Sequence, residues 1–125
     1  MIILDASALI AFVRKENGKK QVEPYISYAL MSAVNFAEVV MRLQTCNIPM
    51  DVIRMIETDL LKEVIPFERD QVYLTAELRE QTKLLGLSFA DRACLALGKL
   101  KGLSVLTGDK AWAKLDIGVE IKFIR

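Results

Sequence analysis

Four acidic residues stand where an α/β protein could assemble a site for chemistry. Asp5 and Asp109 each follow a short apolar run that is typical of a buried strand. Asp91 and Glu38 lie in segments whose apolar residues have helical spacing. Because ligands of open α/β sheets bind outside the carboxyl ends of the strands, we expect these four side chains to meet at one sheet edge.

A cluster of carboxylates favours a hard divalent cation. Carboxylates within several ångströms repel one another and raise one another's pKa, and a bound cation removes that repulsion. Ligands that are all oxygen suit Mg²⁺ or Mn²⁺. The chain has no histidine, so hydrolysis at this site would rest on carboxylates and on water activated by the metal.

Each acid also has a purely structural interpretation. Asp5 and Asp109 could each cap a helix, and residues 88–91 read Ser-Phe-Ala-Asp, which fits a capping box. Glu38 is spaced to form an i,i+4 ion pair with Arg42, a pair of small energetic value on an exposed helix. Only the combination of the four acids favours a site.

Several other chemistries lack their motifs. The chain has neither the phosphate-binding loop G-x-x-x-x-G-K-[ST] nor the dinucleotide fingerprint G-x-G-x-x-G. Around Asp5 there is no second acid of the kind expected in receiver domains, and Ser7 occupies the second position of the D-x-D pair of haloacid-dehalogenase-type phosphatases. A serine hydrolase would need a histidine.

Short apolar segments alternate along the chain with segments of helical spacing. The expected strands are residues 1–4, 29–32, 63–67, 104–108 and 119–124. The expected helices are residues 7–15, a short one that ends before Pro24, and residues 33–46, 50–62, 68–86, 88–102 and 109–115. Ser32 is expected to cap the third of these helices, and Gly86 to follow the end of the fifth. Continuous apolar strands of this kind predict an α/β domain with a mainly parallel sheet covered by helices on both faces.

Length and composition fit one intracellular domain. The 125 residues suffice for one hydrophobic core, and no apolar run is long enough to cross a bilayer. The apolar start lacks a basic region, so we do not interpret it as a signal peptide and expect a cytoplasmic protein. Cys46 and Cys94 are then expected to be free, buried thiols, and two cysteines without histidine argue against zinc.

In the four acids and the segments around them, the sequence resembles PIN-domain ribonucleases, specifically the VapC-like toxins of prokaryotic toxin–antitoxin pairs. Residues 3–12 are similar to the opening strand and first acid of the family, residues 32–40 to the segment with the second acid, and residues 86–112 to the closing block with the last two. By this resemblance the catalytic and metal-binding residues are Asp5, Glu38, Asp91 and Asp109, with Ser7, Asn35 and Thr107 as polar residues that support them.

The resemblance implies a specific fold, activity and set of partners. It implies that residues 1–125 form a single PIN domain, a three-layer α/β/α sandwich around a mainly parallel sheet. It also implies an endoribonuclease that depends on Mg²⁺ or Mn²⁺ and acts as a toxin, a homodimer, and an antitoxin that covers the site. One alternative is a non-catalytic module that binds RNA or protein. The other is a nuclease that acts on DNA, since metal chemistry at phosphate does not require the 2′-OH.

The charge distribution is compatible with an RNA substrate. The net charge is only +1, but setting the four site acids aside leaves 17 basic against 12 acidic residues, a net charge of +5. Such an excess favours phosphate binding, although a solvated basic surface is the simpler interpretation. The candidate RNA contacts are Lys15, Lys19, Lys20 and Lys110.

Two adjacent helical segments are candidates for the antitoxin surface. Residues 33–46 and 50–62 are rich in methionine and isoleucine, namely Met41, Met50, Met55, Ile53 and Ile56. Methionine-rich faces adapt well to a partner helix. The alternative is that these side chains fill the core.

Overall fold

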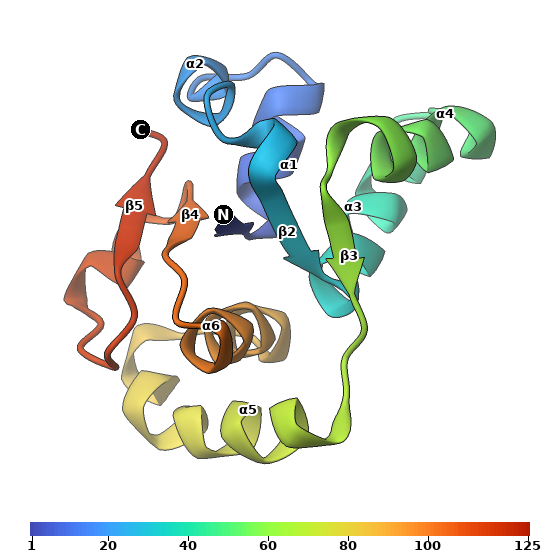
Figure 1. The fold of residues 1–125 in the computed structure, drawn as a ribbon. Helices are drawn as coiled ribbons and strands as arrows, with labels where there is room; N and C mark the ends of the chain where they lie inside the picture. Colours follow the sequence, from blue (N-terminus) through green and yellow to red (C-terminus); the bar gives the residue numbers. More distant parts are fainter.

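The computed structural model describes residues 1–125 as one five-stranded, entirely parallel sheet between helices (Figure 1). The strands are β1 (Ile2–Leu4), β2 (Ala29–Ser32), β3 (Glu63–Ile65), β4 (Val105–Thr107) and β5 (Ile121–Phe123), in the spatial order β3-β2-β1-β4-β5. The helices are α1 (Ala6–Val13), α2 (Lys19–Val22), α3 (Ala33–Thr45), α4 (Met50–Met55), α5 (Arg69–Thr82) and α6 (Phe89–Lys101). Shorter turns are the 3₁₀ helices η1 (Ile26–Tyr28), η3 (Lys83–Leu85) and η4 (Lys110–Lys114), and the π-helical η2 (Ile56–Leu60).

Two separate hydrophobic cores lie on the two faces of the sheet. Successive side chains of a strand point to opposite faces, so Ile2 and Leu4 of β1 join one core while Ile3 joins the other. Helices α1 to α4 supply the first core, and α5 and α6 supply the second, as their places in Figure 1 show. Burial on both faces explains why the strands are continuous apolar runs. The predicted three-layer α/β/α architecture is confirmed.

The predicted helix over residues 50–62 is only partly regular. The α-helix α4 ends at Met55 and passes into the π-helical turn η2. The Thr58 hydroxyl donates a hydrogen bond of 3.2 Å to the carbonyl oxygen of Arg54, and such bonding to the backbone bends helices. The segment 68–86 likewise ends in η3, and Gly86 follows it with a φ of +69°, as predicted for a glycine that ends a helix.

Close packing fixes α6 against the sheet. A Cβ atom at Gly98 would lie 2.7 Å from Cγ2 of Val105 in β4, so only glycine allows α6 to approach the strand this closely. At its other end, α6 begins at Ser88 with a complete capping box, as predicted. Ser32 caps α3 as predicted, by accepting a hydrogen bond from the Val34 amide at 3.2 Å. These contacts fix the starts of α3 and α6, the helices that carry Glu38 and Asp91.

The cysteine predictions hold in part. Both cysteines are free, and Cys94 is buried in α6. The prediction that Cys46 is buried was wrong, because it lies half-exposed at the end of α3, where the Arg14 guanidinium donates a hydrogen bond to its sulfur. None of the helices combines the length and the apolar character that crossing a membrane requires.

Candidate active site

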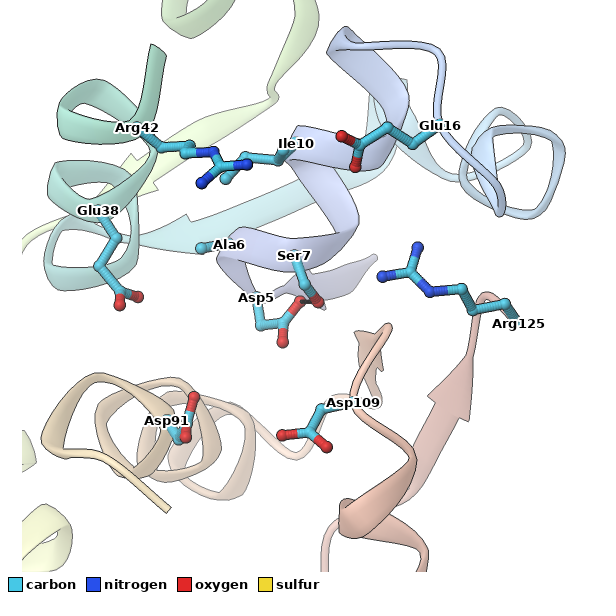
Figure 2. A pocket seen from close by; sticks show the side chains of 10 residues that line it. All are labelled: Asp5, Ala6, Ser7, Ile10, Glu16, Glu38, Arg42, Asp91, Asp109 and Arg125. Carbon is cyan, nitrogen blue, oxygen red and sulfur yellow. Dashed lines mark hydrogen bonds between the residues drawn. The ribbon is translucent and has the colours of Figure 1, made fainter. Parts of the chain in front are cut away.

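An acidic pocket of about 410 Å³ opens at the carboxyl ends of β1 and β4 (Figure 2). All four acids singled out in the sequence line this pocket, namely Asp5, Glu38, Asp91 and Asp109. They come from four different parts of the chain: the end of β1, the middle of α3, the first turn of α6 and the turn after β4. The parallel sheet brings these segments to one edge, as the argument from strand ends predicts.

The Asp5 carboxylate is the most buried of the acids and the most tightly held. It is 5% exposed. Its Oδ1 accepts hydrogen bonds from the Ser7 hydroxyl at 2.7 Å and the Ala8 amide at 3.0 Å, and its Oδ2 accepts one from the Thr107 hydroxyl at 2.6 Å. Asp5 is therefore the N-cap of α1, and a residue of β4 also fixes its orientation.

The two hydroxyl groups are themselves fixed by the backbone after β4. The Gly108 amide donates to the Ser7 hydroxyl oxygen at 2.9 Å, and the Asp109 amide donates to the Thr107 hydroxyl oxygen at 3.0 Å. Each hydroxyl thus accepts from the backbone and donates to Asp5, which leaves it a single orientation. Ser7 and Thr107 therefore hold the Asp5 carboxylate in place, and their support of a metal site stays a prediction.

Burial raises the pKa of Asp5 to about 6. The hydrogen bonds from Thr107, Ser7 and Ala8 act in the opposite direction, and the nearby charge of Asp91 adds to the rise. Burial also raises the pKa of Glu38, against a hydrogen bond from Asn35 and with a smaller contribution from Asp91. We expected mutual repulsion to raise the pKa values of these carboxylates, whereas the main cause for both Asp5 and Glu38 is loss of hydration.

Asp91 and Asp109 each use one oxygen for helix capping and leave the other free. Oδ2 of Asp91 accepts from the Ser88 amide at 2.9 Å, and Oδ1 of Asp109 accepts from the Ala111 amide at 3.0 Å at the start of η4. The second oxygen of each carboxylate makes no hydrogen bond within the chain. The structural interpretation and the site interpretation of these acids are therefore compatible.

Asn35 connects the helix of Glu38 to the helix of Asp91. It is 1% exposed, and its Nδ2 donates to the Ala90 carbonyl of α6 at 2.9 Å and to Oε1 of Glu38 at 3.4 Å. Its own Oδ1 is buried without a partner. Glu38 and Arg42 do not form the ion pair that was the structural alternative for Glu38, since none of the ion pairs of the structure joins them.

The donor set fits a hydrated divalent cation. No basic nitrogen lies within 4.0 Å of an oxygen of the four carboxylates, so none of them forms an ion pair within the chain. No three of these side chains converge closely enough to enclose an ion by themselves. Mg²⁺ usually keeps several water ligands and takes one or two carboxylates directly. Oxygen donors spread around one open pocket therefore suit a hard divalent cation bound partly through water.

Three charged residues of the pocket were not predicted from the sequence as site residues. Glu16, Arg42 and Arg125 also line it (Figure 2). Two of them carried a signal: Arg42 is one helical turn after Glu38, and Arg125 follows β5 at the same sheet edge as the acids. The proposed RNA contacts do not line this pocket, since Lys15, Lys19 and Lys20 surround a separate depression and Lys110 is exposed next to Asp109.

The fold and the pocket together define an α/β/α domain with an acidic site at the carboxyl ends of its parallel strands. Residues 2–118 match the model of the PIN domain family, and the chain belongs to that family. No curated protein sequence matches the chain significantly.

Several solved structures have a similar fold at low sequence identity. A toxin–antitoxin complex from Klebsiella pneumoniae has a chain with a TM-score of 0.76 and 20% identity, covering 97% of this chain and 100% of that chain. A chain of the DNA-bound VapBC from Salmonella typhimurium has a TM-score of 0.77 and 16% identity, and the match covers 100% of both chains. VapC20 of Mycobacterium tuberculosis has a TM-score of 0.72 and 17% identity, and the match covers 96% of this chain and 99% of that chain. VapC20 is described as a toxin that cleaves the sarcin–ricin loop.

The raised pKa of Asp5 makes stability depend on pH. A folded pKa of about 6 against an ordinary 3.8 means that the folded state holds the proton more tightly. The contribution of Asp5 to the free energy of unfolding is therefore fully present below pH 3.8, and it is lost as the pH rises through about 6. Asp5→Asn should therefore stabilise the metal-free protein increasingly between these values, by up to about 3 kcal/mol. Parallel melting-temperature profiles of wild type and variant, measured with a chelator, would contradict this.

Proposed function

We propose that this protein is an endoribonuclease that depends on Mg²⁺ or Mn²⁺ and acts in the cytoplasm as the toxin of a toxin–antitoxin pair. The observation that carries the proposal is the set of four carboxylates around one pocket, each without a basic partner. Membership of the PIN domain family supports it. The VapC20 match, a toxin described as cleaving the sarcin–ricin loop, favours RNA as the substrate.

The metal would be held by Asp5, Glu38 and Asp91, directly or through water, with Asp109 at the other side of the pocket. When bound, the cation would polarise the scissile phosphate and make water a stronger nucleophile at neutral pH. Ser7 and Thr107 keep the Asp5 carboxylate in one orientation. The free oxygen of Asp109 can accept a hydrogen bond from the attacking water and so orient it.

RNA would extend beyond the pocket. Lys110 directly follows Asp109, and we assign it and Lys15, Lys19 and Lys20 to backbone contacts outside the site. Lys19 already has partners, since its Nζ lies 3.5 Å from Glu23 and over the Phe12 ring. Its contribution should therefore be smaller than that of Lys15 or Lys20, which are exposed.

Asp5→Asn and Asp91→Asn should each abolish RNA cleavage in the presence of Mg²⁺ or Mn²⁺, because asparagine keeps the shape and removes the charge that holds the cation. Ser7→Ala and Thr107→Val should cost less, roughly 10- to 100-fold, as is usual for groups that orient a metal ligand. Asp70→Asn is the matched control, because Asp70 lies in the first turn of α5 as Asp91 does in α6. Cleavage rates on RNA and on DNA of the same sequence measure this.

Two outcomes would count against the nuclease proposal. If purified Asp5→Asn protein still cleaves RNA within a few fold of the wild-type rate, the Asp5 carboxylate is not required for the reaction. Binding of RNA without cleavage under any divalent cation would favour the non-catalytic module. Faster cleavage of DNA than of RNA would change the substrate class but keep the site.

An antitoxin partner is supported by the match to a toxin–antitoxin complex. The two helices that the sequence analysis selected divide into a buried and an exposed part. Ile53 and Ile56 are buried in the core, which is the alternative left open for them. The methionine surface consists of the exposed side chains of α3 and α4, namely Met41, Met50, Val52 and Met55. We assign this surface to a helix of the antitoxin.

Met41→Asp combined with Met55→Asp should abolish the complex with the protein encoded by the neighbouring gene, because two charges would be desolvated in an apolar contact. These two side chains are 58% and 56% exposed, so the fold should survive. Leu84→Asp is the matched control, since Leu84 is 93% exposed in η3. Copurification followed by size-exclusion chromatography with light scattering measures the complex and the proposed homodimer together.

A complex that survives the double substitution would place the antitoxin elsewhere. A strictly monomeric free chain would contradict the homodimer. Neither result affects the nuclease proposal, which rests on the acids.

A further inference from the structure

A basic side chain stands in the acidic pocket without a carboxylate partner. Arg125 follows β5, and its guanidinium points toward Ser7 across from Asp109 (Figure 2). No carboxylate oxygen lies within 4.0 Å of it, although Glu16 and Asp109 line the same pocket. An arginine surrounded by acids but paired with none keeps its charge available to an anion.

The guanidinium is held in place by the backbone. Its NH1 group donates a hydrogen bond of 2.7 Å to the Asn17 carbonyl oxygen. The loop of Asn17 is itself anchored, because Gly18 has a φ of +104° and the buried Ile124 packs on it, where a Cβ would lie 2.8 Å from the isoleucine. A guanidinium has five N–H donors, and this hydrogen bond uses one of them.

Gly108 provides the space for this arrangement. A Cβ at Gly108 would lie 2.9 Å from NH2 of Arg125 and 3.2 Å from the Ser7 hydroxyl oxygen. The same glycine amide holds the Ser7 hydroxyl that orients Asp5. The absence of a side chain at residue 108 thus places the guanidinium next to the hydroxyl network of Asp5.

We propose that Arg125 binds a backbone phosphate of the RNA substrate at the β5 side of the pocket. This inference rests on the nuclease function proposed above. Arg42 and Arg125 are the only basic residues that line the pocket, and they come from different walls, Arg42 from α3 and Arg125 from the segment after β5 (Figure 2). A polyanion that enters a pocket lined by carboxylates is repelled by them, and cationic side chains in the same pocket offset that repulsion. The planar fork of arginine also suits the paired oxygens of a phosphate.

The salt dependence of RNA binding tests this contact. The Asp5→Asn protein, which should leave RNA intact, is titrated with labelled single-stranded RNA of random sequence at several salt concentrations and constant Mg²⁺. Each phosphate contact on a single strand contributes about 0.7 to the slope of log affinity against log salt. Arg125→Ala should lower the slope by about this amount and weaken binding about tenfold at low salt. Arg125→Lys should keep the slope, because the charge remains, and restore part of the affinity.

Two further variants separate phosphate binding from a structural role. Lys101→Ala removes the same charge at the far end of α6, about 15 Å along the helix from Asp91, and should leave the slope unchanged. Gly108→Ala shifts the guanidinium but keeps its charge, so it should weaken binding less than Arg125→Ala does, and should weaken it no further when Arg125 is already alanine. A role limited to holding the Asn17 loop would change the melting temperature but not the slope.

The outcomes distinguish this inference from the proposed function. If the wild-type protein cleaves RNA but Arg125→Ala does not change the slope of log affinity against log salt, the inference is overturned and the nuclease proposal stands. RNA binding that depends on Arg125 in a chain that cleaves nothing would overturn the nuclease and leave the phosphate contact. A slope that falls equally for Lys101→Ala would also overturn the inference.

Discussion

The buried carboxylate of Asp5 is the constraint around which the sheet edge is built. A charge with 5% exposure requires strong hydrogen bonds, and Asp5 receives them from Ser7, Ala8 and Thr107. These donors come from α1 and β4, so the hydrogen bonds determine where α1 begins and where the chain leaves β4. The amides of residues 108 and 109 complete the network, which orients the turn that carries Asp109.

The same acids serve the fold and the pocket. Asp5, Asp91 and Asp109 each cap a helical segment, and a negative charge at a helix N-terminus is favourable by itself. Capping therefore offsets part of the cost of gathering carboxylates, and it aims the remaining oxygens at common space. The remaining cost, seen in the raised pKa values of Asp5 and Glu38, is what a bound cation would relieve.

The architecture and the meeting of the four acids at one sheet edge were predictable because both follow from local patterns. Buried parallel strands are continuous apolar runs, and their carboxyl ends mark the site edge whatever the details of packing. Arg125 follows β5 at the same sheet edge, but it was not identified as a site residue, because the entry of its side chain into the pocket depends on the register of β5 and on the space beside Gly108. The division between buried Ile53 and exposed Met55 depends on how α4 packs, and helical periodicity within that segment did not settle it.

We propose above all that the pocket of Asp5, Glu38, Asp91 and Asp109 binds a divalent cation. Anomalous diffraction from crystals grown with Mn²⁺ tests it most directly, because manganese is located without reference to activity. The account predicts an anomalous peak inside this pocket in the wild type, and loss of that peak in Asp5→Asn crystals grown in the same way. A wild-type pocket without a peak, or an equal peak in the Asp5→Asn protein, would contradict it.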